Sequence, residues 1–191
     1  MSTIQDYFKQ AELALAAYAN LQVGVPNTVA LQDDGRGMSP AQAQRFSENW
    51  LVVDQFSDPL SGFSATLFQE IDAQGNPVGE KRLAIRGTND PFDVLTDVVS
   101  IALLGTTALQ SQYQSLKTYY QQLISEGKLG AAETFGVTGH SLGGFLAQSF
   151  AVDYAGKNVT FSMSGKSILK DVISPDILLN YNAGIFDRWV T

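Results

Sequence analysis

The stretch Thr134-Phe135-Gly136-Val137-Thr138-Gly139-His140-Ser141-Leu142-Gly143-Gly144 decides the fold of this chain. Its first five residues are short, β-branched or aromatic and predict a strand, and Phe145–Ala151 just beyond it predict a packed helix. A Gly-x-Ser-x-Gly motif at such a strand-to-helix turn is typical of a nucleophile elbow, which lifts a serine hydroxyl out of a sheet. Gly139 and Gly143 then leave room for backbone that side chains would block. The alternative is a chance Gly-Ser turn, which the flanking strand and helix disfavour.

A second motif, Arg86-Gly87-Thr88, closes a predicted strand at Lys81–Ile85. In an α/β hydrolase the oxyanion hole takes one amide from the residue after the nucleophile, here Leu142, and one donor from an earlier strand-end loop. We therefore expect Thr88 to be the second donor, with Asp97 accepting from the Thr88 hydroxyl and fixing its rotamer. The alternative is a plain strand-to-helix turn in which Thr88 is the N-cap.

The segment between these residues, Asn89–Thr96, carries Phe92 and Leu95 among mostly polar neighbours. Two interpretations are equally supported. The segment is either a short amphipathic lid over the serine or an ordinary surface helix that both apolar residues anchor to the core.

Composition indicates one domain over residues 1–191, with 45% hydrophobic residues and 17 Gly to build its core. A net charge of -7 argues against nucleic-acid binding and against electrostatic docking on anionic membranes. The sequence has no Cys, which excludes disulfides, thiol catalysis and zinc–thiolate sites but leaves the compartment open.

The N-terminal residues predict an amphipathic docking helix rather than a signal peptide, because charged residues interrupt any apolar run. Its apolar residues at helical spacing are Ile4, Phe8, Ala11, Leu15 and Tyr18. The longest apolar stretch, Val98–Leu109, is too short to span a bilayer, so no integral membrane protein is expected.

Elsewhere the sequence alternates helices and strands, and after Lys81 this favours a mostly parallel sheet. Ser39 and Pro40 predict a helix start, as N-cap and first helical residue, with the helix running to about Asn49. The other predicted elements are strands at Trp50–Phe56, Phe63–Ile71 and Ile177–Tyr181, and a helix at Leu109–Glu126 that buries Leu116, Tyr119, Tyr120 and Leu123 and ends at Gly127.

Three stretches together resemble the class 3 lipases, serine esterases of the α/β-hydrolase fold that act on triacylglycerols and phospholipids. They are Leu83–Thr88, Asp93–Asp97 and Val137–Gly144, and the resemblance covers about Trp50 to Ala155. The stretch Ser61–Asp97, with Gly75 in its hairpin, looks especially like the bacterial lipases and phospholipases. Val94 stands where the family often has a lid Trp.

The resemblance implies an α/β-hydrolase fold with a mostly parallel central sheet. It implies Ser141 as nucleophile, Thr88 and Leu142 as oxyanion donors, Asp97 as support for Thr88, and a lid at Asn89–Thr96. The expected substrate is a lipid ester at a lipid–water interface. No cofactor is expected, although related bacterial lipases often carry calcium-binding repeats. The resemblance favours secretion.

The family's acid and base are not recognisable in this chain. The sequence has one His, His140, which lies next to Ser141 and is expected to pack and hydrogen-bond within the elbow rather than act as base. The family order is Ser, Asp, His, and Asp171, Asp176 and Asp187 do not stand where the acid is expected. We therefore expect a domain incomplete at its C-terminus, inactive alone, with Asp and His beyond Thr191. The alternative is a non-catalytic pseudo-hydrolase domain that binds a lipid or a partner.

Overall fold

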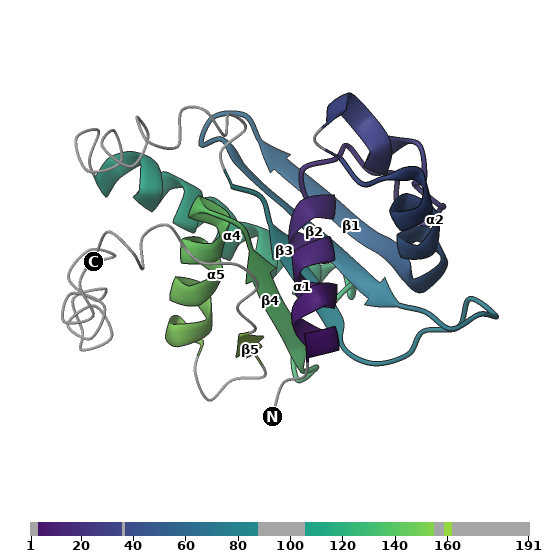
Figure 1. The fold of residues 1–191 in the computed structure, drawn as a ribbon. Helices are drawn as coiled ribbons and strands as arrows, with labels where there is room; N and C mark the ends of the chain where they lie inside the picture. The colour runs from purple at the N-terminus through teal and green to yellow at the C-terminus, as the bar shows by residue number, and fades with distance from the viewer. Residues whose placement is uncertain (1–3, 36, 88–105, 155–158, 162–191) are drawn as a thin grey trace.

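The computed structural model describes residues 4–35, 37–87, 106–154 and 159–161, and these form one mixed sheet with helices on both faces (Figure 1). The strands lie in the order β1-β2-β3-β4-β5. Their bounds are Trp50–Asp58 for β1, Phe63–Glu70 for β2, Lys81–Ile85 for β3, Phe135–Gly139 for β4 and Val159–Phe161 for β5. β1, β2 and β3 pair antiparallel, whereas β3, β4 and β5 pair parallel. The parallel part begins at Lys81, as the sequence predicts.

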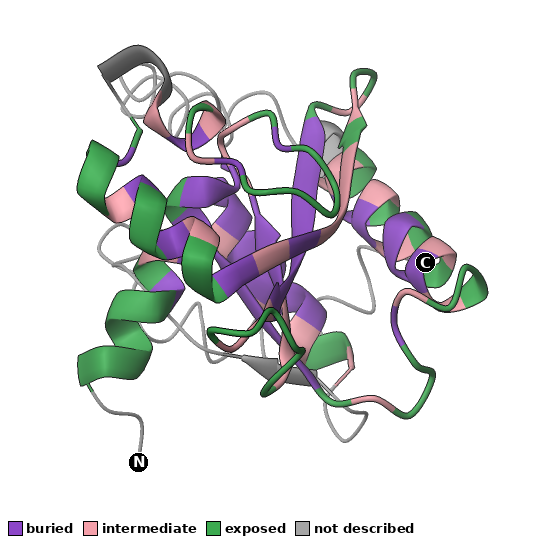
Figure 2. Ribbon diagram, turned by 90° about the vertical axis from the view of Figure 1, so that its right-hand side faces the viewer, coloured by how far each residue is buried: buried purple, intermediate pink, exposed green. Residues whose placement is uncertain are grey.

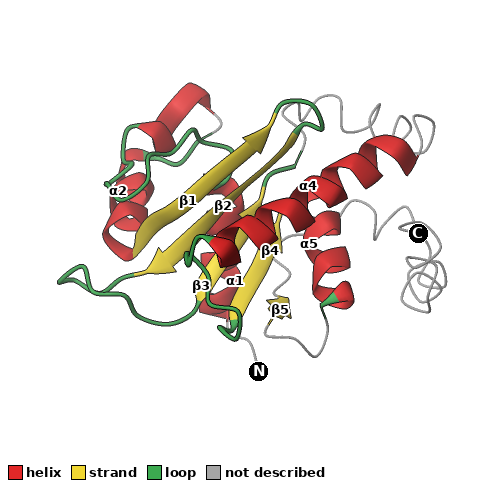
Figure 3. Ribbon diagram, turned by 180° about the vertical axis from the view of Figure 1, so that it is seen from behind, coloured by secondary structure: helices red, strands yellow, loops and turns green. Residues whose placement is uncertain are grey.

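Helices cover both faces of this sheet. On one face lie α1 (Ile4–Ala16) and α2 (Pro40–Asn49), with the short 3-10 helix η1 (Ala30–Gly35) beside them. On the other face lie α4 (Thr106–Ser125) and α5 (Leu142–Asp153), as comparison of Figures 1 and 3 shows. None of the described helices is long and apolar enough to cross a membrane.

Alternating side chains along the strands divide the core in two. In β3, Leu83 and Ile85 pack with Leu116 of α4 and Leu146 of α5, whereas Ala84 between them joins the cluster on the opposite face. This is the period of two expected of a strand that is covered on both faces. Figure 2 shows the result, with buried residues along the strands and exposed residues on the outer sides of the helices.

Local signals set the helix ends as predicted. The Ser39 side chain accepts from the Gln42 amide and the Gln42 side chain accepts from the Ser39 amide, which forms a capping box at the start of α2. Gly127 follows α4 with a φ of 69°, which an L side chain rarely adopts. The four residues predicted to be buried on α4 are all buried. The predicted strand at Ile177–Tyr181 lies outside the described residues.

The face on which α1 docks was predicted wrongly. Ile4, Phe8 and Leu15 are 88%, 48% and 36% exposed, and the helix instead buries Leu13, Ala14 and Ala16. Leu13, Ala16 and Ala17 pack in one buried cluster with Ala84 of β3, the small residue that β3 presents to this side of the sheet. The helix therefore comes close to the sheet through its alanines.

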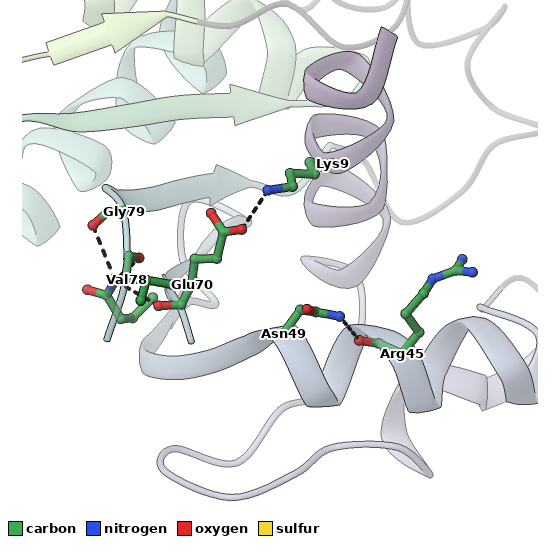
Figure 4. Close-up of polar contacts among 7 residues, drawn as sticks. Lys9, Arg45, Asn49, Glu70, Val78 and Gly79 are labelled. Atoms are coloured by element: carbon green, nitrogen blue, oxygen red, sulfur yellow. Dashed lines mark hydrogen bonds and ion pairs between the residues drawn. The ribbon is translucent and has the colours of Figure 1, made fainter. Parts of the chain in front are cut away.

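Polar contacts at the surface also hold α1 in place. Lys9 Nζ lies 2.5 Å from Glu70 Oε1 at the end of β2 (Figure 4), and Arg45 of α2 pairs with Glu12 at 3.3 Å. The Arg45 guanidinium also lies 5.8 Å from the centre of the Phe8 ring. Such exposed pairs add little stability each, so the buried alanine contacts are the main support of the helix.

Candidate active site

Ser141 lies in a tight turn between β4, which ends at Gly139, and α5, which begins at Leu142. Its φ is 54° and its ψ is −126°, and it is the one non-glycine residue with positive φ among the described residues. The predicted strand-to-helix turn is therefore present. A non-glycine residue in such a region costs about 1–3 kcal/mol, and residues of this kind cluster at functional sites.

Glycines make this turn sterically possible. A Cβ on Gly139 would collide with the Gly143 carbonyl, and a Cβ on Gly143 would collide with the Ile85 carbonyl oxygen and lie 2.8 Å from Arg86 C. The first turn of α5 therefore packs directly on the end of β3. The elbow and the start of the predicted oxyanion loop are consequently in backbone contact.

The N-terminus of α5 lies beside the serine. The Ser141 carbonyl accepts from the amides of Gly144 and Phe145, at 3.0 and 3.2 Å, and so begins the helix. The first amides of a helix, here from Leu142 on, have no partner within the helix and carry its positive dipole end. Leu142 itself is buried, and the Ser141 side chain makes no capping hydrogen bond. The Ser141 hydroxyl is thus not engaged in holding the helix start.

Gly87, of the Arg86-Gly87-Thr88 motif, lies next to the turn that carries Ser141. A Cβ on Gly87 would lie 2.6 Å from the His140 carbonyl oxygen and 3.2 Å from Ser141 Cβ. Thr88 follows immediately, but Thr88, Asp97 and the proposed lid Asn89–Thr96 lie outside the described residues. The structure therefore brings Ser141 and Leu142 together and shows that the backbone leading to Thr88 arrives next to Ser141.

Tyr18, just after α1, is a third member of the site that sequence reasoning missed. Its hydroxyl would lie 2.5 Å from a Cβ on Gly87, and it lies 3.2 Å from His140 Nδ1. The Tyr18 and His140 rings meet edge to face at 6.2 Å. The sequence presents Tyr18 only as one more apolar residue of a helix, so no local pattern could reveal this contact.

The electrostatics around Tyr18 are set by burial and by Arg86. Burial raises the pKa of Tyr18, while a hydrogen bond from the Gly87 amide and the nearby Arg86 charge act in the opposite direction. Burial lowers the pKa of Arg86, and its Nε has no hydrogen-bond partner within the described residues. A cation thus stands beside the site, where it favours negative charge that develops nearby.

His140 is exposed, and the described residues show no hydrogen bond between it and the Ser141 hydroxyl. Within the described residues its polar contact is with Tyr18, in line with the expected role in hydrogen bonding at the elbow. No group of three His, Cys, Asp or Glu side chains suited to a metal ion occurs in the described part of the chain.

Comparison with known proteins supports the fold. No protein-family model matches the sequence, and no curated protein matches it. Among solved structures, the chain is similar to lipase II from Rhizopus niveus, with 22% identity, a TM-score of 0.53, and coverage of 84% of this chain and 61% of that one. It is also similar to a lipase from Rhizopus microsporus var. chinensis, with 20% identity, a TM-score of 0.56, and coverage of 85% and 58%.

These similarities show a partial α/β-hydrolase fold of the lipase type, as the sequence predicts. The chain spans about three fifths of the length of both solved lipases. The solved neighbours are fungal, and the expected bacterial character finds no support among them.

Proposed function

We propose that residues 1–191 are the nucleophile-bearing part of a serine carboxylic-ester hydrolase that acts on lipids. The observation that carries this proposal is the backbone of Ser141, held at φ 54° between β4 and α5 with Gly87 against its Cβ. Strain of this kind is retained where it presents a side chain for chemistry. The similarity to two lipases supports a lipid ester as substrate, and we propose a triacylglycerol or a phospholipid.

In the proposed reaction, Ser141 Oγ attacks the ester carbonyl carbon while a base takes its proton. The negative oxygen of the tetrahedral intermediate accepts from the Leu142 amide and from Thr88, which Asp97 orients. The bond to the alcohol then breaks, the alcohol leaves with the proton, and water hydrolyses the acyl-enzyme to the free acid. We propose that the acid and base of the triad follow Thr191, so that residues 1–191 form an incomplete domain.

We also propose that Asn89–Thr96 is a lid with Phe92 and Leu95 on its apolar face. Opening such a lid exposes apolar surface that a lipid interface covers. Hydrolysis of a short triacylglycerol should then rise sharply once the substrate exceeds its solubility and forms droplets. A rate that saturates smoothly through that concentration would contradict the lid.

The test of the nucleophile uses the full-length protein, a fluorophosphonate probe and a short p-nitrophenyl ester. We expect the probe to label Ser141, and Ser141→Ala to abolish both labelling and turnover. Ser111→Ala, at an exposed position on α4, is the matched control and should change neither. Labelling at another residue, or full activity in the Ser141→Ala protein, would refute the assignment.

One observation favours a second candidate, a non-catalytic domain that binds a lipid or protein partner. The single histidine of the sequence is exposed and contacts Tyr18 rather than the Ser141 hydroxyl. Residues 1–191 alone should therefore not hydrolyse p-nitrophenyl esters. Turnover by the full-length protein but not by residues 1–191 supports the enzyme. Absence of turnover in both supports the binding domain.

A further inference from the structure

We propose that the Tyr18 hydroxyl is a positioning group of the proposed active site, which holds the Gly87 backbone beside the Ser141 elbow. This inference rests on the proposed esterase function. It adds a residue from the N-terminal helix region to a site otherwise built from the β3 and β4 ends.

Three distant segments meet at Gly87. The point where a Cβ on Gly87 would stand lies 2.5 Å from Tyr18 Oη, 2.6 Å from the His140 carbonyl oxygen and 3.2 Å from Ser141 Cβ. The Tyr18 hydroxyl and the elbow therefore both crowd the Cβ side of Gly87, where no side chain has room. Without that hydroxyl, the backbone has room to move away from Ser141.

The Tyr18 hydroxyl contacts both halves of the site. A phenol has one proton and two acceptor lone pairs. His140 Nδ1 lies 3.2 Å from the Tyr18 oxygen, as donor or acceptor according to its tautomer, and the same oxygen lies 2.5 Å from the Cβ position of Gly87. The Tyr18 oxygen thus contacts both Gly87, at the start of the predicted oxyanion loop, and His140, which precedes the nucleophile.

The position of Tyr18 is fixed because hydrogen bonds hold the backbone that follows it. Gln55 of β1 accepts from the Leu21 amide at 2.8 Å and donates to the Ala19 carbonyl at 2.9 Å. Its Nε2 also donates to Thr66 Oγ1 of β2 at 2.8 Å. The residues on either side of Tyr18 are thereby fastened to the sheet, through Gln55 on one side and the buried Ala17 on the other.

Burial also keeps this hydroxyl in the form that the role requires. A phenol is already protonated at neutral pH, and burial raises the pKa of Tyr18 further, so the hydroxyl brings no negative charge to the site. A negative charge there would oppose the oxyanion that forms during the reaction. Arg86 nearby acts in the same favourable direction as the neutral phenol.

The test compares Tyr18→Phe, which keeps the ring, with Tyr18→Leu, which removes ring and hydroxyl, in the full-length protein. Hydrolysis of p-nitrophenyl butyrate is measured at a temperature where circular dichroism shows each variant folded. Because donor displacement weakens the transition state and not substrate binding, we expect kcat to fall about 10- to 100-fold in both variants with KM nearly unchanged. Tyr7→Phe, at an exposed position on α1, is the control and should match the wild type.

A second readout does not depend on activity. The Gly87 amide should exchange its hydrogen faster in the Tyr18→Phe protein, because the hydroxyl beside it is gone and the backbone can move, while the amides of β3 keep their protection. Loss of kcat with faster Gly87 exchange supports the proposal.

Three outcomes would overturn the inference. Wild-type kcat in Tyr18→Phe with loss only in Tyr18→Leu would show that the ring packs and the hydroxyl does not matter, and would leave the esterase function standing. A Tyr18→Phe protein that never folds would show a purely structural hydroxyl. Absence of Ser141-dependent turnover in the wild type would instead remove the proposed function, and the catalytic role of Tyr18 with it.

Discussion

The backbone of Ser141 can be tested by stability alone, with two variants that both lack the hydroxyl. Ser141→Ala keeps a Cβ at φ 54° and ψ −126°, whereas Ser141→Gly removes it. These angles lie close to those of the first central residue of a type II′ turn, which glycine adopts without steric cost. The two proteins differ by one methyl group, so their difference in free energy of unfolding reports the backbone strain.

The expected magnitude follows from two opposing effects. Relief of strain at a non-glycine residue in this region contributes about 1–3 kcal/mol. The greater freedom of glycine in the unfolded chain costs about 0.4–1 kcal/mol. Ser141→Gly should therefore be more stable than Ser141→Ala by up to about 2.6 kcal/mol, and each kcal/mol corresponds to about 2–4 °C in Tm for a chain of this size.

Urea unfolding followed by circular dichroism measures this difference, with Gln114 as the control position. Gln114 is exposed in the interior of α4, where Gly should be less stable than Ala by about 1 kcal/mol. The two positions should thus give opposite signs. If Gly is also less stable than Ala at position 141, the turn is not strained and the main support for a nucleophile elbow is lost.

Three further predictions concern other parts of the fold. Gly143→Ala should destabilise the protein by about 1–3 kcal/mol and abolish fluorophosphonate labelling, because its Cβ collides with the Ile85 carbonyl; unchanged labelling would contradict the contact. Ser39→Ala should cost about 1 kcal/mol in urea unfolding through loss of the α2 cap, and Ser39→Asp should restore most of it. Hydrogen bonds, first from Ser115, lower the pKa of Asp58 from 3.8 to about 2, so its contribution to stability is complete above pH 3.8 and is lost as pH falls through about 2. The free energy of unfolding should accordingly fall less steeply between pH 3.8 and about 2 in Asp58→Asn than in the wild type. Identical curves would contradict a stabilising contribution from the Asp58 carboxylate.

The parts of the fold that the sequence predicts well are those with local physical causes. The start of α2 follows from Ser39 and Pro40, and β3 matches its predicted range, Lys81–Ile85. The elbow follows from glycine spacing between a strand and a helix. In each case the deciding residues are neighbours in the chain.

The errors and omissions concern contacts between distant segments. The docking face of α1 was misjudged because large apolar residues dominate a periodicity argument, whereas the helix packs on Ala84 mainly through Leu13 and Ala16. Tyr18 was missed as a site residue because its partners, Gly87 and His140, are set by the sheet topology. No local pattern contains that information.

The sheet topology also has a consequence for how this protein forms during synthesis. The antiparallel strands β1, β2 and β3 are joined by short connections, so they can assemble as soon as Ile85 is available. α1 contacts β4 as well as β3, and Tyr18 and His140 lie 122 positions apart in the chain. At 5–20 residues per second, the ribosome needs about 6–24 s to make that interval, during which α1 lacks its contacts with β4. We expect a nascent chain that ends within α4 to contain a folded meander but no site, so that the hydroxyl of Ser141 and the groups around it come together in the last steps of folding.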